Sequence, residues 1–202
     1  NFNQKVDYAY NVKGWLRTVN QPGSLDRDLF ALDLRYNTPE NTSTLPATAR
    51  YNGNISQMRW DTGTPAGYGF GYDGLSRLTS ATYAEGTSFS FNTGAFTTSY
   101  AYDANGNFTN LIRKLDSIQA DNLVYSYLSG GNRLMQVADG TGNSLGYRAV
   151  TGQYSYDSNS NMTYDVSKGF TITYNQLNLP QQVSCVNDYE LYTWDAAGNK
   201  LA

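Results

Sequence analysis

The stretch Tyr100-Ala-Tyr102-Asp103-Ala-Asn105-Gly106-Asn107-Phe108 decides the fold. Tyr100 and Tyr102 alternate with other residues, which places both rings on one face of a β-strand. The segment from Asp103 to Asn107 is typical of a tight turn, because Asp and Asn side chains bond nearby backbone groups and Gly accepts positive φ at little cost. The stretch therefore predicts a strand, a turn and the beginning of a returning strand.

Related stretches recur along the chain, such as Tyr154-Ser-Tyr156-Asp157-Ser-Asn159-Ser-Asn161-Met162 and Tyr192-Thr-Trp194-Asp195-Ala-Ala-Gly198-Asn199-Lys-Leu201. We take the last aromatic residue before each turn as the marker of a repeat. Eight markers lie between positions 10 and 194, at an average spacing of about 26 residues, which suits one two-stranded unit per repeat. The markers are Tyr10, Tyr51, Tyr72, Tyr102, Tyr127, Tyr156, Tyr174 and Trp194.

The turns after these markers are of two kinds. In one kind Gly-Asn or a related pair follows the acidic residue, and in the other kind a Leu follows. We predict a structural role for the turn residues, with each Asp bonding backbone amides and holding its hairpin closed. The first kind comprises Asp103 to Asn107 with Gly106, Asp157 to Asn161, Asp195 to Asn199 with Gly198, and a shortened copy at 51–55. The second comprises Asn11 to Leu16, Asp73 to Leu78, Asn175 to Leu179, and Tyr127 to Leu134 with one inserted residue.

The composition agrees with an all-β fold, since the 202 residues include 18 Tyr, which favours strands, and 19 Gly, which punctuates turns. We predict consecutive antiparallel β-hairpins, roughly fourteen to eighteen strands in all, that form a curled or spiral sheet. A single domain over residues 1–202 is expected, with an irregular insert at about 21–50.

Within that insert Leu32, Leu34 and Tyr36 alternate with charged residues, which predicts a strand. A helix over 26–34 is the alternative, although no capping carboxylate follows at the right distance and Pro39 would end it. The neighbouring segment 37–48 is rich in Thr, Asn and Pro and is expected to be an exposed loop.

Charge and residue usage exclude several classes of function. The 14 Lys and Arg against 17 Asp and Glu give a net charge of -3, which argues against a nucleic-acid partner. No apolar run approaches the ~20 residues of a membrane span. The chain has no His and a single cysteine, Cys185, so no internal disulfide can form and the commonest general base is missing. We predict no catalytic residue, no metal site and no cofactor.

Three patterns imitate functional motifs. Gly69-Phe-Gly71-Tyr-Asp-Gly74 satisfies G-x-G-x-x-G, but it runs through a strand into a turn instead of opening a helix. The turns at Asp103 and Asp157 imitate the start of an EF-hand loop, but the Gly and Glu expected later in that loop are absent. Weak calcium binding at a turn stays open. Carboxylate pairs for glycoside hydrolysis also stay open, although these Asp residues recur at turns.

Exposed aromatic rings beside Asn and Asp would suit stacking against sugars. The candidates for this role are Trp15, Trp60 and Trp194. The alternative for each indole is packing between neighbouring hairpins.

The repeated Tyr-Asp turn resembles the YD repeat of RHS-repeat proteins. The match rests on Tyr72-Asp73 with Arg77-Leu78, Tyr102-Asp103 with Gly106-Asn107, Tyr156-Asp157 with Asn161, and Trp194-Asp195 with Gly198-Asn199. It extends from Tyr8 to Leu201. Departures include Trp194 in place of Tyr, and Asn11 and Asn175 in place of Asp. Nothing in the chain resembles the acidic core segment that drives self-cleavage in some members.

This resemblance implies a ribbon of hairpins that winds into a shell, which encloses a C-terminal toxin in toxin-complex subunits and polymorphic toxins. The chain would then be a fragment of a larger secreted or cell-surface protein and would act as a non-catalytic scaffold. Its partners would be the rest of its own RHS shell and an enclosed C-terminal cargo. The alternative function is a binding module for carbohydrate or a cell-surface partner. A free wall segment would also expose two sheet edges, for which we expect dimerisation.

Overall fold

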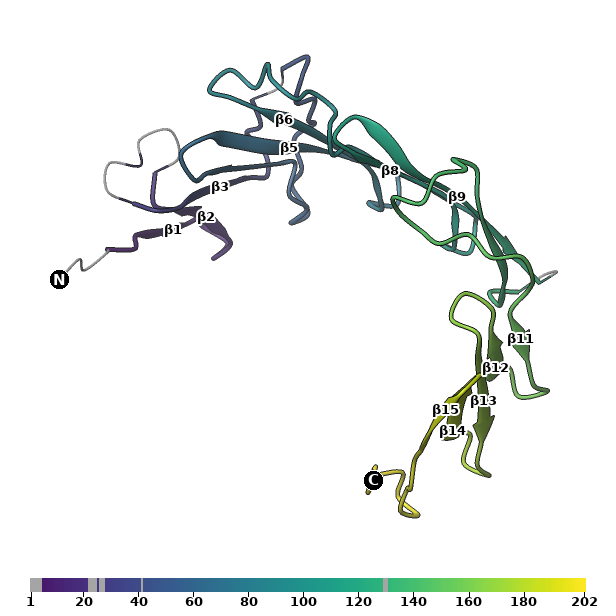
Figure 1. The fold of residues 1–202 in the computed structure, drawn as a ribbon. Coiled ribbons are helices and arrows are strands. Elements are labelled where there is room, and N and C mark those ends of the chain that lie inside the picture. Colours follow the sequence, from purple (N-terminus) through teal and green to yellow (C-terminus); the bar gives the residue numbers. More distant parts are fainter. Residues whose placement is uncertain (1–4, 22–24, 26–27, 41, 129–130) are drawn as a thin grey trace. The chain divides into compact units, whose positions relative to one another are not determined.

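The computed structural model describes residues 5–21, 25, 28–40, 42–128 and 131–202. The described part contains fifteen strands and no helix, which confirms the all-β prediction (Figure 1). The strands are β1 (Tyr8–Tyr10), β2 (Leu16–Val19), β3 (Ala31–Arg35), β4 (Gln57–Asp61), β5 (Pro65–Tyr72), β6 (Leu78–Glu85), β7 (Thr98–Tyr102), β8 (Phe108–Leu115), β9 (Ile118–Tyr127), β10 (Leu134–Asp139), β11 (Ser155–Tyr156), β12 (Met162–Asp165), β13 (Phe170–Tyr174), β14 (Pro180–Cys185) and β15 (Asp188–Leu191).

Strand order follows chain order, with β1 to β10 in one sheet and β11 to β15 in another. Neighbouring strands therefore pair as antiparallel hairpins, and the register shifts by one residue where several of the turns close. Tyr10 pairs with Leu16, for example, although Ala9 pairs with Thr18. The same shift occurs at Tyr72, Tyr156 and Tyr174. One extra residue on the returning strand is a β-bulge, which increases the local twist.

Contacts divide the chain into two compact units, each described by itself below. Unit 1 comprises 1–101 and 111–121, and unit 2 comprises 102–110 and 122–202. The expectation of a single domain stays a prediction.

The alternation of Gly with aromatic residues in β5 organises unit 1. Tyr68 lies on one face of the sheet, where it packs with Trp60 and Tyr83 at ring-centroid distances of 5.8 and 5.1 Å. Gly67 and Gly69 fall on the opposite face, because successive residues of a strand point to opposite sides. The sheet thus offers an aromatic face and a face without side chains on this strand.

A segment that connects β3 to β4, residues 37–40 and 42–50, covers the glycine face, and we call it the strap. Leu45 is fully buried and clusters with Ala84 and Phe89. A Cβ on Gly69 would lie 2.4 Å from the carbonyl oxygen of Pro46, so only glycine permits this approach. The prediction of a loop at 37–48 is confirmed for the described residues, but the loop is not exposed throughout, since Leu45 and Ala47 are buried against the sheet. Its one large apolar residue anchors it, and the Thr, Asn and Pro around Leu45 hid that signal.

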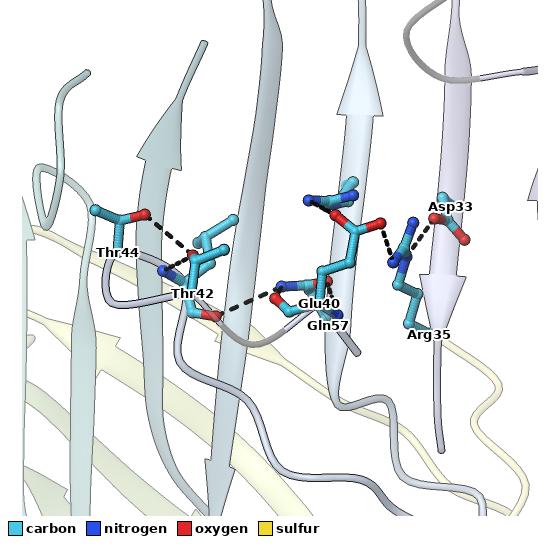
Figure 2. Close-up of polar contacts among 8 residues, drawn as sticks. Asp33, Arg35, Glu40, Thr42, Thr44 and Gln57 are labelled. Atoms are coloured by element: carbon cyan, nitrogen blue, oxygen red, sulfur yellow. Dashed lines mark hydrogen bonds and ion pairs between the residues drawn. The ribbon is translucent and has the colours of Figure 1, made fainter. Parts of the chain in front are cut away.

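Charged side chains fasten the start of the strap to the sheet (Figure 2). The Glu40 carboxylate pairs with Arg35 and Arg59, each at 2.6 Å, and Arg35 also pairs with Asp33 at 2.6 Å. The fully buried Gln57 side chain donates to the Glu40 carbonyl at 3.0 Å and accepts from the Glu40 amide at 3.3 Å. Partial burial alone would raise the pKa of Glu40, but the hydrogen bonds from Arg35 and Arg59 outweigh it and lower that pKa.

The strand predicted around Leu32 and Leu34 is β3. The alternative helix is absent from 31–34, and residues 26 and 27 lie outside the described part. Tyr36, which directly follows β3, is buried.

Unit 2 has a thinner core than unit 1. Leu123 and Val137 are buried, whereas every residue of β15 is exposed. With so little apolar surface buried, the hairpins of this unit depend more on hydrogen bonds at their turns and between neighbours.

Candidate functional site: the repeated turn and its neighbour contact

Six of the turns share one hydrogen-bond pattern. In the turn from Asp103 to Asn107, the Asp103 Oδ1 accepts the backbone N–H groups of Asn105 and Asn107 at 2.9 and 2.8 Å. The Asp103 N–H donates to the Asn107 carbonyl at 2.9 Å, and the Gly106 N–H donates to the Asp103 carbonyl at 3.2 Å. One side-chain oxygen thus satisfies two amides. The same pattern recurs in the turns that begin at Asn11, Asp73, Asp157, Asn175 and Asp195.

Only the Oδ1 atom is needed for this pattern, and an Asn side chain carries the same acceptor. Asn11 accepts from Lys13 and Trp15 at 2.9 and 3.0 Å, with the geometry of the acidic turns. The two departures from Asp, at Asn11 and Asn175, therefore keep the turn intact.

The fourth residue of each of these turns has a left-handed backbone. Gly occupies this position three times, as expected for positive φ. Ser76, Ser160 and Asn178 occupy it in the other turns with φ of 64°, 70° and 58°. The glycine positions are Gly14, Gly106 and Gly198, with φ of 77°, 88° and 82°. The sequence pattern indicated Gly106 and Gly198, whereas it missed Ser76 and Ser160 because Ser is not a strong signal for this conformation. Gly14 and Asn178 lie in Leu-kind turns, where the prediction relied on the Leu and did not single them out.

The fifth residue distinguishes the two kinds of turn. In the Gly-Asn kind the Asn side chain donates to the second carboxylate oxygen, as from Asn161 to Asp157 at 2.9 Å. In the Leu kind the fifth residue varies: Arg77 takes that place in the Asp73 turn and pairs with Asp73 at 2.6 Å, while Trp15 and Leu179 occupy it in the turns at Asn11 and Asn175. These contacts lower the pKa of the turn carboxyls: the Asn161 side chain does so for Asp157, and the backbone N–H of Arg77 contributes most for Asp73. The corresponding pairs are Asn107 with Asp103 and Asn199 with Asp195.

An aromatic donor links each of several hairpins to the one before it. The Tyr174 hydroxyl donates to the Met162 carbonyl at 2.8 Å, and Met162 is the first residue of β12. Five further aromatic residues do the same to a carbonyl 14 to 22 positions earlier in the chain. They are Tyr36 to Leu16 at 2.9 Å, Tyr72 to Ile55 at 2.6 Å, Tyr127 to Phe108 at 2.8 Å, Tyr156 to Leu134 at 2.8 Å, and Trp194 to Pro180 at 2.7 Å.

This contact accounts for Trp194 at a position where tyrosine would be expected. Its indole Nε1–H is a donor at the end of a flat ring, like the phenolic hydroxyl. The sequence pattern identified the aromatic position, but it gave no sign that the polar tip of the ring, as well as its face, is used.

Tyr36 replaces Tyr51 as the marker of the second hairpin. Tyr36 directly follows β3 and donates to Leu16, whereas Tyr51 lies in the connection to β4 with its side chain 70% exposed. The sequence favours Tyr51 because Asn-Gly-Asn follows it, and it hides Tyr36 because the strap separates this residue from the rest of its turn.

The other markers lie at strand ends. Tyr10 ends β1, Tyr102 ends β7 and Tyr127 ends β9. The turn after Tyr127 is longer by one residue and is closed by a hydrogen bond from the Leu128 N–H to the Arg133 carbonyl at 2.9 Å.

Turn tips also contact each other within a unit. The Asn161 side chain donates to the Asn178 side chain of the next turn at 2.9 Å, and Asn107 donates to Asn132 at the same distance. Neighbouring hairpins are therefore joined at their tips as well as through their aromatic residues.

The three tryptophans predicted as sugar-stacking candidates all have protein neighbours. Trp60 packs with Tyr68 and Tyr83, and Trp194 is held by its bond to Pro180. Trp15 lies 5.1 Å from the ring of Tyr36, with the Lys13 ammonium 4.8 Å from its own centroid.

The remaining motif-like patterns have structural explanations. Gly69 and Gly71 lie in β5, where Gly69 admits the strap and a Cβ on Gly71 would lie 2.4 Å from the Ser80 Oγ. The oxygens of Asp103 and Asp157 accept hydrogen bonds from their own turns. Among the described residues, no three His, Cys, Asp or Glu side chains come together as a metal site would require. No helix in the described part is long and apolar enough to cross a membrane.

Comparison with known proteins gives a fold likeness. No family model matches the sequence, and no curated protein matches it. The chain is similar to the crystal structures of TcdB2-TccC3-TEV (TM-score 0.56, 14% identity, 97% of this chain and 11% of that chain) and TcdB2-TccC3-Cdc42 (0.56, 15%, 96% and 11%). It is also similar to a Photorhabdus luminescens Tc holotoxin pore with a mutation in TccC3 (0.54, 14%, 97% and 11%).

At this identity the likeness shows the fold alone. Nearly all of the present chain follows the fold of those proteins, but it spans only about a tenth of their length.

Proposed function

We propose that this chain is a wall segment of an RHS-repeat shell in a secreted or surface-exposed toxin-type protein, and that its role is structural and non-catalytic. The observation that carries the proposal is the repeated neighbour contact. In it, an aromatic residue at the end of one hairpin's first strand or bridge donates to the carbonyl of the residue that begins the second strand of the preceding hairpin. Such a contact serves a wall, because it fixes the spacing of consecutive hairpins whatever residues fill the faces.

Three further features support the structural role. The turn carboxylates are occupied by hydrogen bonds from their own hairpins, as at Asp157 and Asp195. The repeated turn resembles the YD repeat of RHS-repeat proteins, and the fold is similar to that of the Tc toxin structures TcdB2-TccC3-TEV and the Photorhabdus luminescens Tc holotoxin pore. In this proposal the partners are the rest of the shell and a cargo enclosed within it.

A cryo-EM structure of the complete gene product tests the proposal. We expect residues 1–202 to continue into further hairpins of the same kind and to form part of a closed wall around a cavity. A structure in which these residues form a separate module outside any wall would overturn it.

A binding module for carbohydrate or a cell-surface partner is the second candidate. The observation in its favour is the group of exposed aromatic rings beside cationic side chains near the first turn, where Tyr10 and Tyr51 are 61% and 70% exposed. A glycan array tests this second candidate: selective binding that is lost when an exposed aromatic ring is removed would support it, and the absence of selective binding would refute it.

A further inference from the structure

A pocket of about 340 Å³ lies in unit 1 between the tip of the β1–β2 hairpin and the end of the strap. It occupies the groove between the turn that begins at Asn11 and the segment around Tyr51, which takes the place of a turn in the second hairpin. The residues that carry the argument are Tyr10, Lys13, Trp15, Arg17, Arg50 and Tyr51.

The lining of this pocket is cationic. Lys13, Arg17 and Arg50 contribute three positive charges, and no Asp or Glu of the described chain lines it. This concentration contrasts with the net charge of -3 for the whole chain. The Nε atoms of Arg17 and Arg50 are buried, and neither has a hydrogen-bond partner in the described part. Because these donors are closed off and unpaired, the charge of the two guanidinium groups is only partly compensated within the described part, and an anion in the pocket that accepts from their remaining N–H groups would be stabilised.

The pocket also offers flat apolar surfaces. The Trp15 ring packs on Tyr36 and lies under the Lys13 ammonium, so it is held in place. Tyr10 and Tyr51 are 61% and 70% exposed, so large parts of their rings face solvent. Aromatic rings with one polar end suit a ligand that has both apolar C–H groups and hydroxyls.

A second groove between neighbouring turns lacks these positive charges, so the cationic lining is a property of the first pocket and not a general feature of the repeated turns. A comparable pocket in unit 2 lies between the turns at 174–177 and 194–196. Its lining includes Gln176, Gln181 and Asp195, and no Lys or Arg of the described chain lines it. Stacking one turn beside another therefore creates a groove, while the cations at Lys13, Arg17 and Arg50 are particular to the first one.

We propose that the pocket at the first turn binds an anionic sugar residue, with its carboxylate or sulfate at Arg17 and Arg50 and its ring against the exposed tyrosines. Guanidinium groups bind both of these anions through paired hydrogen bonds, and the tyrosine rings supply the surface for the sugar. The proposal is independent of the wall function, because a shell wall can carry a binding site on its surface.

The test is titration of the 202-residue chain with sialyllactose, sulfated lactose, lactose and AMP, followed by calorimetry and by tryptophan fluorescence, in which Trp15 is the indole that lines the pocket. We expect one or both anionic sugars to bind at least about tenfold more tightly than lactose, with affinity that falls as salt rises. The sialylated and sulfated arms identify the anion. Arg17→Gln should weaken binding at least about tenfold, Arg17→Lys should restore part of it, and Lys168→Gln in unit 2 should leave it unchanged.

Arg50 is left unchanged in this test, because its guanidinium also donates to the Tyr72 carbonyl at 3.3 Å and lies 4.9 Å from the Tyr72 ring. Lys13→Gln provides a second variant in case Arg17→Gln disturbs the fold, which the urea midpoint would reveal. Equal binding of lactose and the anionic sugars, tighter binding of AMP, no binding at all, or full affinity in both variants would each overturn the proposal. None of these results would affect the wall function.

Discussion

Removing a single hydroxyl should reveal the energetic value of the contact between neighbouring hairpins. In Tyr36→Phe the ring stays in place and only the hydroxyl that donates to the Leu16 carbonyl at 2.9 Å is lost. The Tyr36 side chain is buried, with 7% exposure, so water cannot fully replace the lost donor. A hydrogen bond of this kind contributes about 0.5–1.5 kcal/mol net, and we expect a loss of about 1 kcal/mol in the free energy of unfolding.

Urea unfolding followed by tryptophan fluorescence measures this loss in unit 1, because Trp15 lies 5.1 Å from the Tyr36 ring. Tyr174→Phe removes the corresponding bond to Met162 in unit 2 and should cost a similar or smaller amount, since that site is more exposed. For a chain of this size, 1 kcal/mol corresponds to a shift of about 2–4 °C in the melting temperature.

The chain contains its own matched control. Tyr10 holds the same position before a turn, but its ring is 61% exposed and its hydroxyl has no hydrogen-bond partner in the described part. Tyr10→Phe should therefore leave the urea midpoint unchanged. If Tyr36→Phe and Tyr174→Phe also left it unchanged, or if Tyr10→Phe lowered it as much, the assignment of the hydroxyl as the link between hairpins would be refuted.

Three further predictions concern the strap and the turns. Leu45→Ala should lower the free energy of unfolding by about 2–5 kcal/mol, because Leu45 is fully buried, while Leu177→Ala at a 54% exposed site should have little effect on the urea midpoint. Gly14→Ala should cost about 1 kcal/mol through the positive φ of 77° alone, since nothing lies within 4 Å of the added Cβ, and Gly74→Ala, which has neither strain nor close neighbours, should be near neutral. Because the pKa of Asp157 is lowered in the folded state, chiefly by Asn161, its contribution is present above pH ~4 and is lost as the pH falls through the folded-state value. Asp157→Asn keeps the Oδ1 acceptor, as Asn11 and Asn175 do, so it should fold at neutral pH and lose less stability on acidification than the parent chain; an unchanged acid titration would contradict this.

Much of the architecture could be predicted from the sequence because its signals are local. The Asp or Asn at the start of each turn bonds backbone groups two and four residues later, so the five-residue pattern at Asp103 or Asp157 contains its own explanation. Strand alternation and the all-β class follow from the same local rules.

What could not be predicted depends on contacts between segments distant in the sequence. The burial of Leu45 requires the bare face made by Gly67 and Gly69, and nothing within the strap itself reports that face. The bond from Tyr36 to Leu16 was hidden because the strap interrupts the second turn, and the pocket beside Arg17 requires Arg50 from the far end of that strap. In each case local propensity was uninformative and tertiary packing decided the outcome.

Every aromatic donor described above reaches toward the N-terminus. Tyr156 bonds Leu134, Tyr174 bonds Met162 and Trp194 bonds Pro180, so each acceptor has been synthesised before its donor. A hairpin leaving the ribosome thus finds its docking point already present in the preceding hairpin, after a delay of only 12 to 22 residues. The direction of these bonds gives the chain a route to fold in the order of translation, adding one hairpin at a time without waiting for its C-terminus.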